Sequence, residues 1–181
     1  RTASARSNLA NVRMDAGELE PAAALYRKAI ATAETTDGVD HPDVAVYLTN
    51  LGNVLIELGE LDEAQQVIER ALAIRERALG EDHPDLVFTL MSLGGVHLTA
   101  ERPGEAVPLL ERALVIVDRG QSEPLAKAAV RFELGQAVAL AGGDRARAQR
   151  LVDEAEVGYR ELGPAGARYL EQVEQWRREN R

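Results

Sequence analysis

The sequence predicts an all-α protein in which helical hairpins follow one another along the chain. Three observations support this fold class: a pattern that repeats every 42 residues, apolar side chains spaced three and four positions apart, and glycines at the expected turns. Composition agrees, because the 181 residues include 29 alanines and only 4% aromatic residues. Alanine favours the helix and allows close packing of helices.

The repeat is clearest between the first two copies. Residues 9–44 and 51–86 are identical at 15 of 36 positions, including Gly-Glu-Leu at 17–19 and 59–61 and Asp-His-Pro-Asp at 40–43 and 82–85. A third copy repeats Leu-Gly at 93–94 and Glu-Arg-Ala-Leu at 111–114. The fourth copy is looser, with Leu-Gly at 134–135 and Gly-Asp at 143–144. Such self-similarity predicts a stacked array.

Each copy is predicted to form two helices joined by a short turn. In the second copy, Leu48, Leu51 and Leu55 recur at helical spacing, and Gly59 is expected to end the first helix. The apolar stripe of the second helix extends from residue 64 to 74, and a glycine at 80 ends it. Pro84 suits the first turn of the helix that follows. We expect the repeats at about 1–41, 42–83, 84–123 and 124–163.

Both ends of the array depart from the repeat pattern. Arg6 and Arg13 occupy apolar positions of the later copies, as an exposed end would require. Residues 164–181 are expected to form a C-terminal capping helix with one apolar stripe. Its Trp176 should pack on the helix that carries Ala155 and Tyr159 rather than bind a ligand.

The Leu-Gly pair at 51–52, followed by Leu55, Ala64, Ile68 and Ala71, resembles the tetratricopeptide repeat. The 42-residue spacing and the Gly-x-Asp-His-Pro loop resemble the kinesin-light-chain type of this repeat. The resemblance implies a right-handed α-solenoid whose first helices line a concave surface, and a role in binding proteins or peptides. Residues 132–148 also resemble arrays that follow protein kinase domains in some bacterial signalling proteins.

Composition and motifs exclude several classes of function. There is no cysteine, and the net charge of −9 opposes binding to nucleic acid. No apolar run is long enough to span a membrane, so we expect a cytoplasmic protein. No nucleophile elbow or phosphate loop is present, and the carboxylates are expected on solvated faces rather than buried. We therefore expect a non-catalytic protein without a cofactor.

The histidines offer a weak candidate for a metal site. His41 and His83 occupy the same loop position in successive copies, whereas His97 lies within a predicted helix. A protein metal site needs more ligands than this pair supplies. We interpret both loop histidines as part of the chemistry of helix entry, and we expect no bound metal.

The predicted binding surface lies on the concave side of the first helices. Asparagines recur there in register, and an amide both donates to and accepts from a peptide backbone. The positions at which chaperone-binding tetratricopeptide domains carry a basic clamp hold a methionine and a serine instead, which favours an apolar contact. The alternative is that these asparagines are ordinary surface residues or ties between helices. The candidate residues are Asn8, Asn11, Asn50, Asn53, Phe88, Met91, Ser92 and Gln136.

Three functions are compatible with this pattern. The first is an interaction module that binds a protein or peptide partner in the concave groove. The second is a regulatory or sensor module of a larger bacterial signalling protein, such as a Ser/Thr protein kinase. The third is a scaffold for homo-oligomerisation, which the polar end at Arg6 and Arg13 disfavours. Since the chain begins without a methionine, we expect a monomeric fragment of a longer protein.

Overall fold

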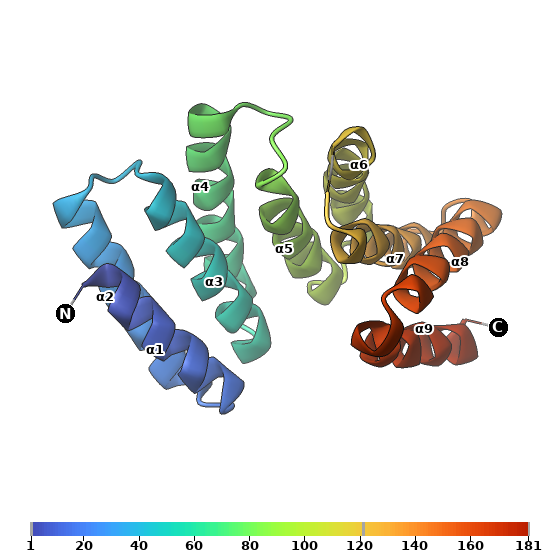
Figure 1. Cartoon of the computed structure of the whole chain (residues 1–181), viewed down its shortest axis with the longest axis horizontal. Helices are drawn as coiled ribbons and strands as arrows, with labels where there is room; N and C mark the ends of the chain where they lie inside the picture. Colours follow the sequence, from blue (N-terminus) through green and yellow to red (C-terminus); the bar gives the residue numbers. More distant parts are fainter. Residues whose placement is uncertain (1, 121, 181) are drawn as a thin grey trace. The chain divides into compact units, whose positions relative to one another are not determined.

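The computed structural model describes residues 2–120 and 122–180; the residues at 1, 121 and 181, which belong to the predicted repeats and the capping helix, lie outside the described residues. Over the described ranges the chain is all-α, with no strand, and the predicted fold class is confirmed (Figure 1). The helices are α1 (Ala3–Asp15), α2 (Leu19–Thr36), α3 (Pro42–Leu58), α4 (Leu61–Leu79), α5 (Leu86–Thr99), α6 (Pro103–Arg119), α7 (Pro124–Leu140), α8 (Arg145–Glu161) and α9 (Ala167–Glu179), with a 3₁₀ turn at Gly163–Gly166.

The helices fall into two compact units, one ending at Ala100 and the other beginning at Glu101. In the first unit, α1 packs on α2 and α3 on α4, which makes two hairpins with short turns (Figure 1). α2 also packs on α3, and α5 packs on both α3 and α4. Small and branched side chains fill the contacts, and Tyr26, Leu51 and Ile68 are completely or almost completely buried.

In the second unit, α7 and α8 form a hairpin, α6 packs on α7, and α9 packs on α8. One apolar cluster joins α7, α8 and α9 and includes Phe132, Ala155, Tyr159 and Trp176. The prediction that Trp176 packs against the helix of Ala155 and Tyr159 is therefore confirmed. The capping helix begins at Ala167, because a 3₁₀ turn occupies the four residues before it.

The helix ends follow the sequence signals with one difference. Gly59 ends α3 with a φ of 78°, a left-handed conformation that costs glycine little, and Gly80 ends α4 with a φ of 90°. His41 stands before α3, and its Nδ1 accepts a hydrogen bond from the Asp43 N–H at 3.2 Å. The same tetrapeptide in the next copy forms a turn, so that α5 begins at Leu86 and not at Pro84.

Two glycines, each preceded by a leucine in its repeat, allow close approach between the helices of a hairpin. A Cβ built on Gly52 would lie 2.3 Å from Ile68 Cγ1, and one built on Gly135 would lie 2.8 Å from Val152 Cγ2. The carbonyl oxygen of Ala148 lies 3.1 Å from the same Gly135 Cβ. The side chain nearest to Gly52 is therefore Ile68 of the next helix.

The two arginines of α1 find partners within the first hairpin. Arg6 donates a hydrogen bond to Thr32, and Arg13 pairs with Glu18. Both arginines therefore have partners within the α1–α2 hairpin, at positions where the second copy places buried leucines. None of the helices in the described part of the chain is long and apolar enough to cross a membrane.

Candidate functional site

The first unit exposes one side of α3 and α5, which we call the first-helix face and define by Val46, Asn50, Asn53, Phe88 and Met91. The two helices contact each other, and the hydroxyls of the buried Thr49 and Thr89 lie 3.5 Å apart between them. Val46 is 40% exposed and Phe88 53% exposed, so two apolar side chains at equivalent repeat positions remain open to solvent.

Asn50 and Asn53 are partly exposed on α3. Neither side chain makes a hydrogen bond with another residue of the described chain. Met91 is likewise partly exposed on α5. These amides and apolar groups, from two contacting helices, offer both donors and acceptors for a backbone and a surface for an apolar side chain.

The other predicted site residues are placed differently. Asn8 is exposed on α1, whereas the amide oxygen of Asn11 accepts a hydrogen bond from the hydroxyl of the buried Tyr26. Ser92 is only 8% exposed on α5. Gln136 belongs to the second unit, on α7.

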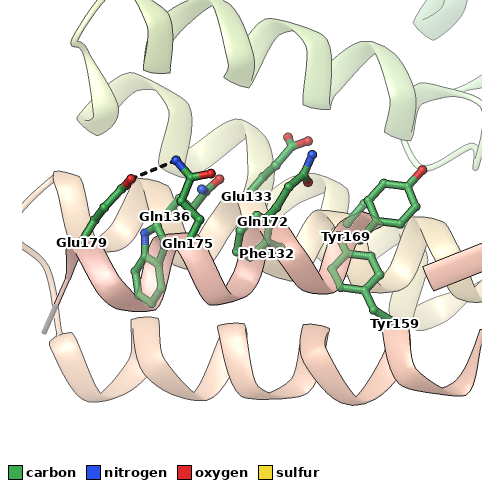
Figure 2. Close-up of a pocket in the computed structure, with 10 residues that line it drawn as sticks. Phe132, Glu133, Gln136, Tyr159, Tyr169, Gln172, Gln175 and Glu179 are labelled. Carbon is green, nitrogen blue, oxygen red and sulfur yellow. Dashed lines mark hydrogen bonds between the residues drawn. The ribbon is translucent and has the colours of Figure 1, made fainter. Parts of the chain in front are cut away.

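In the second unit, Gln136 lines a pocket of about 360 Å³, which we call the Glu133 pocket (Figure 2). Helix α7 supplies one wall, α9 supplies the opposite wall, and Tyr159 reaches in from α8. Figure 2 shows that Glu133 and Gln136 of α7 and Gln172 of α9 extend their polar ends toward the same side of the pocket. The lining residues are Ala129, Phe132, Glu133, Gln136, Tyr159, Tyr169, Gln172, Gln175, Trp176 and Glu179.

Aromatic rings form one end of this pocket. Tyr159 and Tyr169 stack with their ring centroids 5.0 Å apart, and Phe132 meets Tyr159 edge to face at 6.4 Å. The guanidinium carbon of Arg168 lies 4.5 Å from the centroid of Tyr169. Burial, followed by the negative charge of Glu133, raises the pKa of Tyr159 far above its ordinary value, so this phenol stays neutral.

Glu133 brings a carboxyl group into these surroundings. Its Oε2 atom is buried, and no residue in the described chain donates a hydrogen bond to it. Burial raises the pKa of Glu133 from 4.5 to about 8, because removal from water disfavours the charged form. The expectation that the carboxylates lie on solvated faces is therefore wrong for this residue. The sequence placed Glu133 beside Gln136 on a first helix but gave no sign of its burial.

Gln175 is tied to Glu179 along one wall by a hydrogen bond of 2.9 Å from its Nε2 to the carboxylate (Figure 2). The pocket thus holds two acidic groups, three amides and four aromatic rings, and no lysine or arginine is among its lining residues. No serine, threonine or histidine lies there to serve as nucleophile or base. Across residues 2–120 and 122–180, no group of three potential metal ligands was found.

A stack of short helical hairpins with a repeat near 42 residues defines a class of α-helical repeat protein. The family model described as "Tetratricopeptide repeat" matches residues 1–76 and 47–118, more than half of the chain. The chain belongs to the tetratricopeptide repeat family. This fold is generally a non-catalytic one used for protein–protein interaction.

Solved structures show the same fold. BtubC (BKLC) from P. vanneervenii is 24% identical with a TM-score of 0.81, over 90% of this chain and 65% of that chain. This chain therefore spans about two thirds of that protein's length. A Podosopora anserina kinesin light chain with nearly identical TPR-like repeats is 22% identical, with a TM-score of 0.70, over 90% of this chain and 77% of that one.

A more distant likeness connects the chain to a Rap protein solved in complex with Competence and Sporulation Factor. The two are 16% identical with a TM-score of 0.75, and the match covers 93% of this chain and 46% of the Rap protein. At these identities the likeness concerns the fold. No curated protein sequence matches the chain.

Proposed function

We propose that the chain is a non-catalytic interaction module that binds an extended segment of a protein partner on the first-helix face. The observation that carries the proposal is the pair Asn50 and Asn53, which lie partly exposed and without hydrogen-bond partners in the described chain, next to the exposed Phe88 of the contacting helix. An exposed amide exchanges hydrogen bonds to water for hydrogen bonds to a peptide backbone, with a net gain of about 0.5–1.5 kcal/mol for each.

The chemistry of the face suits a partner with both backbone groups and one apolar side chain. Asn50 and Asn53 lie three residues apart on α3, so their amides project from the same side of the helix. Phe88 and Met91 lie on the same side of α5 for the same reason, and methionine adapts to different side-chain shapes. A Rap protein of similar fold was solved in complex with Competence and Sporulation Factor, which supports a binding role for this architecture.

The proposal is tested by selecting binders from a displayed library of random linear peptides and measuring their affinities. Asn50→Ala combined with Asn53→Ala should weaken binding about 5- to 150-fold, since two hydrogen bonds contribute about 1–3 kcal/mol together. Phe88→Ser should weaken binding independently, because it removes an exposed apolar contact. The matched control is Gln66→Ala, which removes an exposed amide from α4.

Thermal melts separate binding from folding. The double asparagine variant should unfold within about 0.5 kcal/mol of the parent, as surface substitutions usually do. Unchanged affinity in both the asparagine variant and Phe88→Ser would reject the first-helix face. A double variant that loses stability would show that the asparagines hold helices together, and Phe88→Ser would then decide the question alone.

A further inference from the structure

We propose that the Glu133 pocket binds the side chain of an arginine of the partner, an inference that rests on the proposed function but concerns a separate surface. The pocket combines a carboxyl whose Oε2 atom is buried without a hydrogen-bond partner in the described chain, a second carboxylate and four aromatic side chains. The first-helix face belongs to the first unit, whereas every residue that lines this pocket belongs to the second.

The acidic groups of the pocket select the ligand, because a bound cation would stabilise the ionised form of Glu133 that burial disfavours. Glu133 and Glu179 both line it, and no cation accompanies them among the lining residues. A buried carboxylate is costly unless a cation or hydrogen-bond donors meet it. The Oε2 atom of Glu133 has neither within the described chain, so a donor that arrives with positive charge would satisfy it.

The amides of the pocket add acceptors. Gln136 and Gln172 make no hydrogen bond with other described residues, and both line the pocket with Glu133. Their carbonyl oxygens would accept from N–H groups that do not reach the carboxylate. A guanidinium carries five N–H donors in one plane, whereas an ammonium carries three on a single nitrogen. The number and spread of the acceptors therefore favour arginine over lysine.

The aromatic side chains favour the same ligand. Phe132 and Trp176 line the same pocket, and a guanidinium stacks on aromatic faces while it pairs with a carboxylate. The unit already contains a contact between a guanidinium and an aromatic ring, because Arg168 lies over the ring of Tyr169. That arginine approaches the ring from α9 itself and is not among the residues that line the pocket.

The experiment uses small probes and the only tryptophan of the chain. N-acetyl-arginine methylamide is titrated into the whole protein while the fluorescence and the indole N–H resonance of Trp176 are followed. We expect saturable binding with a Kd on the order of 1 mM, as befits one side chain. The citrulline analogue, which is neutral but similar in shape, should bind at least 10-fold more weakly, and the lysine analogue should fall between them.

Glu133→Gln should reduce the affinity for the arginine probe at least 10-fold. The fluorescence and the indole N–H resonance of Trp176 in the free variant should match those of the folded parent. The matched control is Glu171→Gln, which neutralises an exposed carboxylate of α9 outside the pocket and should bind like the parent. Equal binding of the arginine and citrulline probes, or equal binding by the parent and Glu133→Gln, would overturn the proposal.

The same probes keep the two proposals distinguishable. Asn50→Ala combined with Asn53→Ala should leave the arginine probe unaffected, because those residues lie in the other unit. If selected peptides bind the first-helix face but the arginine probe fails, this inference alone is wrong. If the probe binds as expected and no peptide binds the face, the proposed function fails and the arginine site stands.

Discussion

Gly52 controls how closely α3 and α4 approach each other. Because a Cβ there would lie 2.3 Å from Ile68 Cγ1, Gly52→Ala forces the helices apart or Ile68 into a strained position. We expect a loss of about 1–3 kcal/mol in the free energy of unfolding, measured by urea denaturation.

The control for this substitution is Gly95→Ala on α5. A Cβ there meets no atom within 4 Å, so the variant should gain about 0.5–1 kcal/mol from helix propensity. Two variants that shift in the same direction would contradict the role of Gly52 as a close contact.

The ionisation of Glu133 links stability to pH. Its pKa is about 8 in the folded protein and near 4.5 when exposed, so the folded state binds more protons between these values. Stability therefore falls as pH rises from about 4.5 through 8. Glu133→Gln lacks this ionisation, so the variant should be more stable than the parent above pH 8 by up to about 5 kcal/mol.

The measurement is the difference in unfolding free energy between parent and Glu133→Gln at pH 5, 7 and 9. The difference should be small at pH 5 and grow with pH, because only the parent must bury a charge. A constant difference across this range would mean that the carboxyl is hydrated in the folded protein. Glu171→Gln, on an exposed surface, serves as the reference that should not change with pH.

Single residues show how far the sequence predicts the surroundings of a side chain. The repeat register placed Asn50 and Asn53 on an open side of α3, and the structure leaves both partly exposed. The hydrogen bond from Tyr26 to Asn11 was not predicted. Tyr26 occupies the repeat position that Ile68 holds in the second copy, and a tyrosine at a buried position indicates that its hydroxyl needs a partner. The burial of the Glu133 Oε2 atom was not predicted, because apolar spacing does not report the surroundings of a polar side chain.

Helix α9 completes the apolar cluster of the second unit. Val173 and Trp176 are 1% and 9% exposed and pack in the same cluster as Val152, Ala155 and Tyr159. Removal of residues 163–181 should expose this cluster, lower the thermal stability of the chain and promote aggregation. The readouts are light scattering and the binding of a dye specific for exposed apolar surface.

A milder variant tests the same element without a truncation. Trp176→Ala should cost about 3–5 kcal/mol because it leaves a large void among buried side chains. Arg178→Ala, at an exposed position of the same helix, should change stability by less than about 0.5 kcal/mol. A truncated chain that remains monomeric and equally stable would contradict the role of α9.

Elements were predicted more completely than their boundaries. Apolar spacing and glycine positions fixed the existence and order of the helices, because both signals are local to the chain. The identical tetrapeptides at 40–43 and 82–85 nevertheless start α3 at Pro42 and α5 at Leu86. Identical local sequences thus differ by two residues in where the helix begins, a difference that packing in each repeat decides and that the tetrapeptide alone does not encode.

At the scale of the whole molecule, the net charge of −9 shapes the encounter with partners. A basic peptide should associate faster at low ionic strength, because the negative field attracts it over about one Debye length. Raising the salt from 50 to 500 mM should slow the association of an arginine-containing peptide by about 10-fold. Stopped-flow measurements with the citrulline form of the same peptide provide the control, which should respond much less.

The glycine contacts have a consequence for how such chains grow. Gly52 meets Ile68 and Gly135 meets Val152, so each contact closes within a single hairpin. A tandem duplication of 42 codons would therefore copy both members of the contact at once, and the two helices of the new hairpin would already pack against each other. Only the surfaces toward the two flanking hairpins would remain for selection to adjust. Gene duplication thus lengthens such an array without first passing through an ill-fitting intermediate.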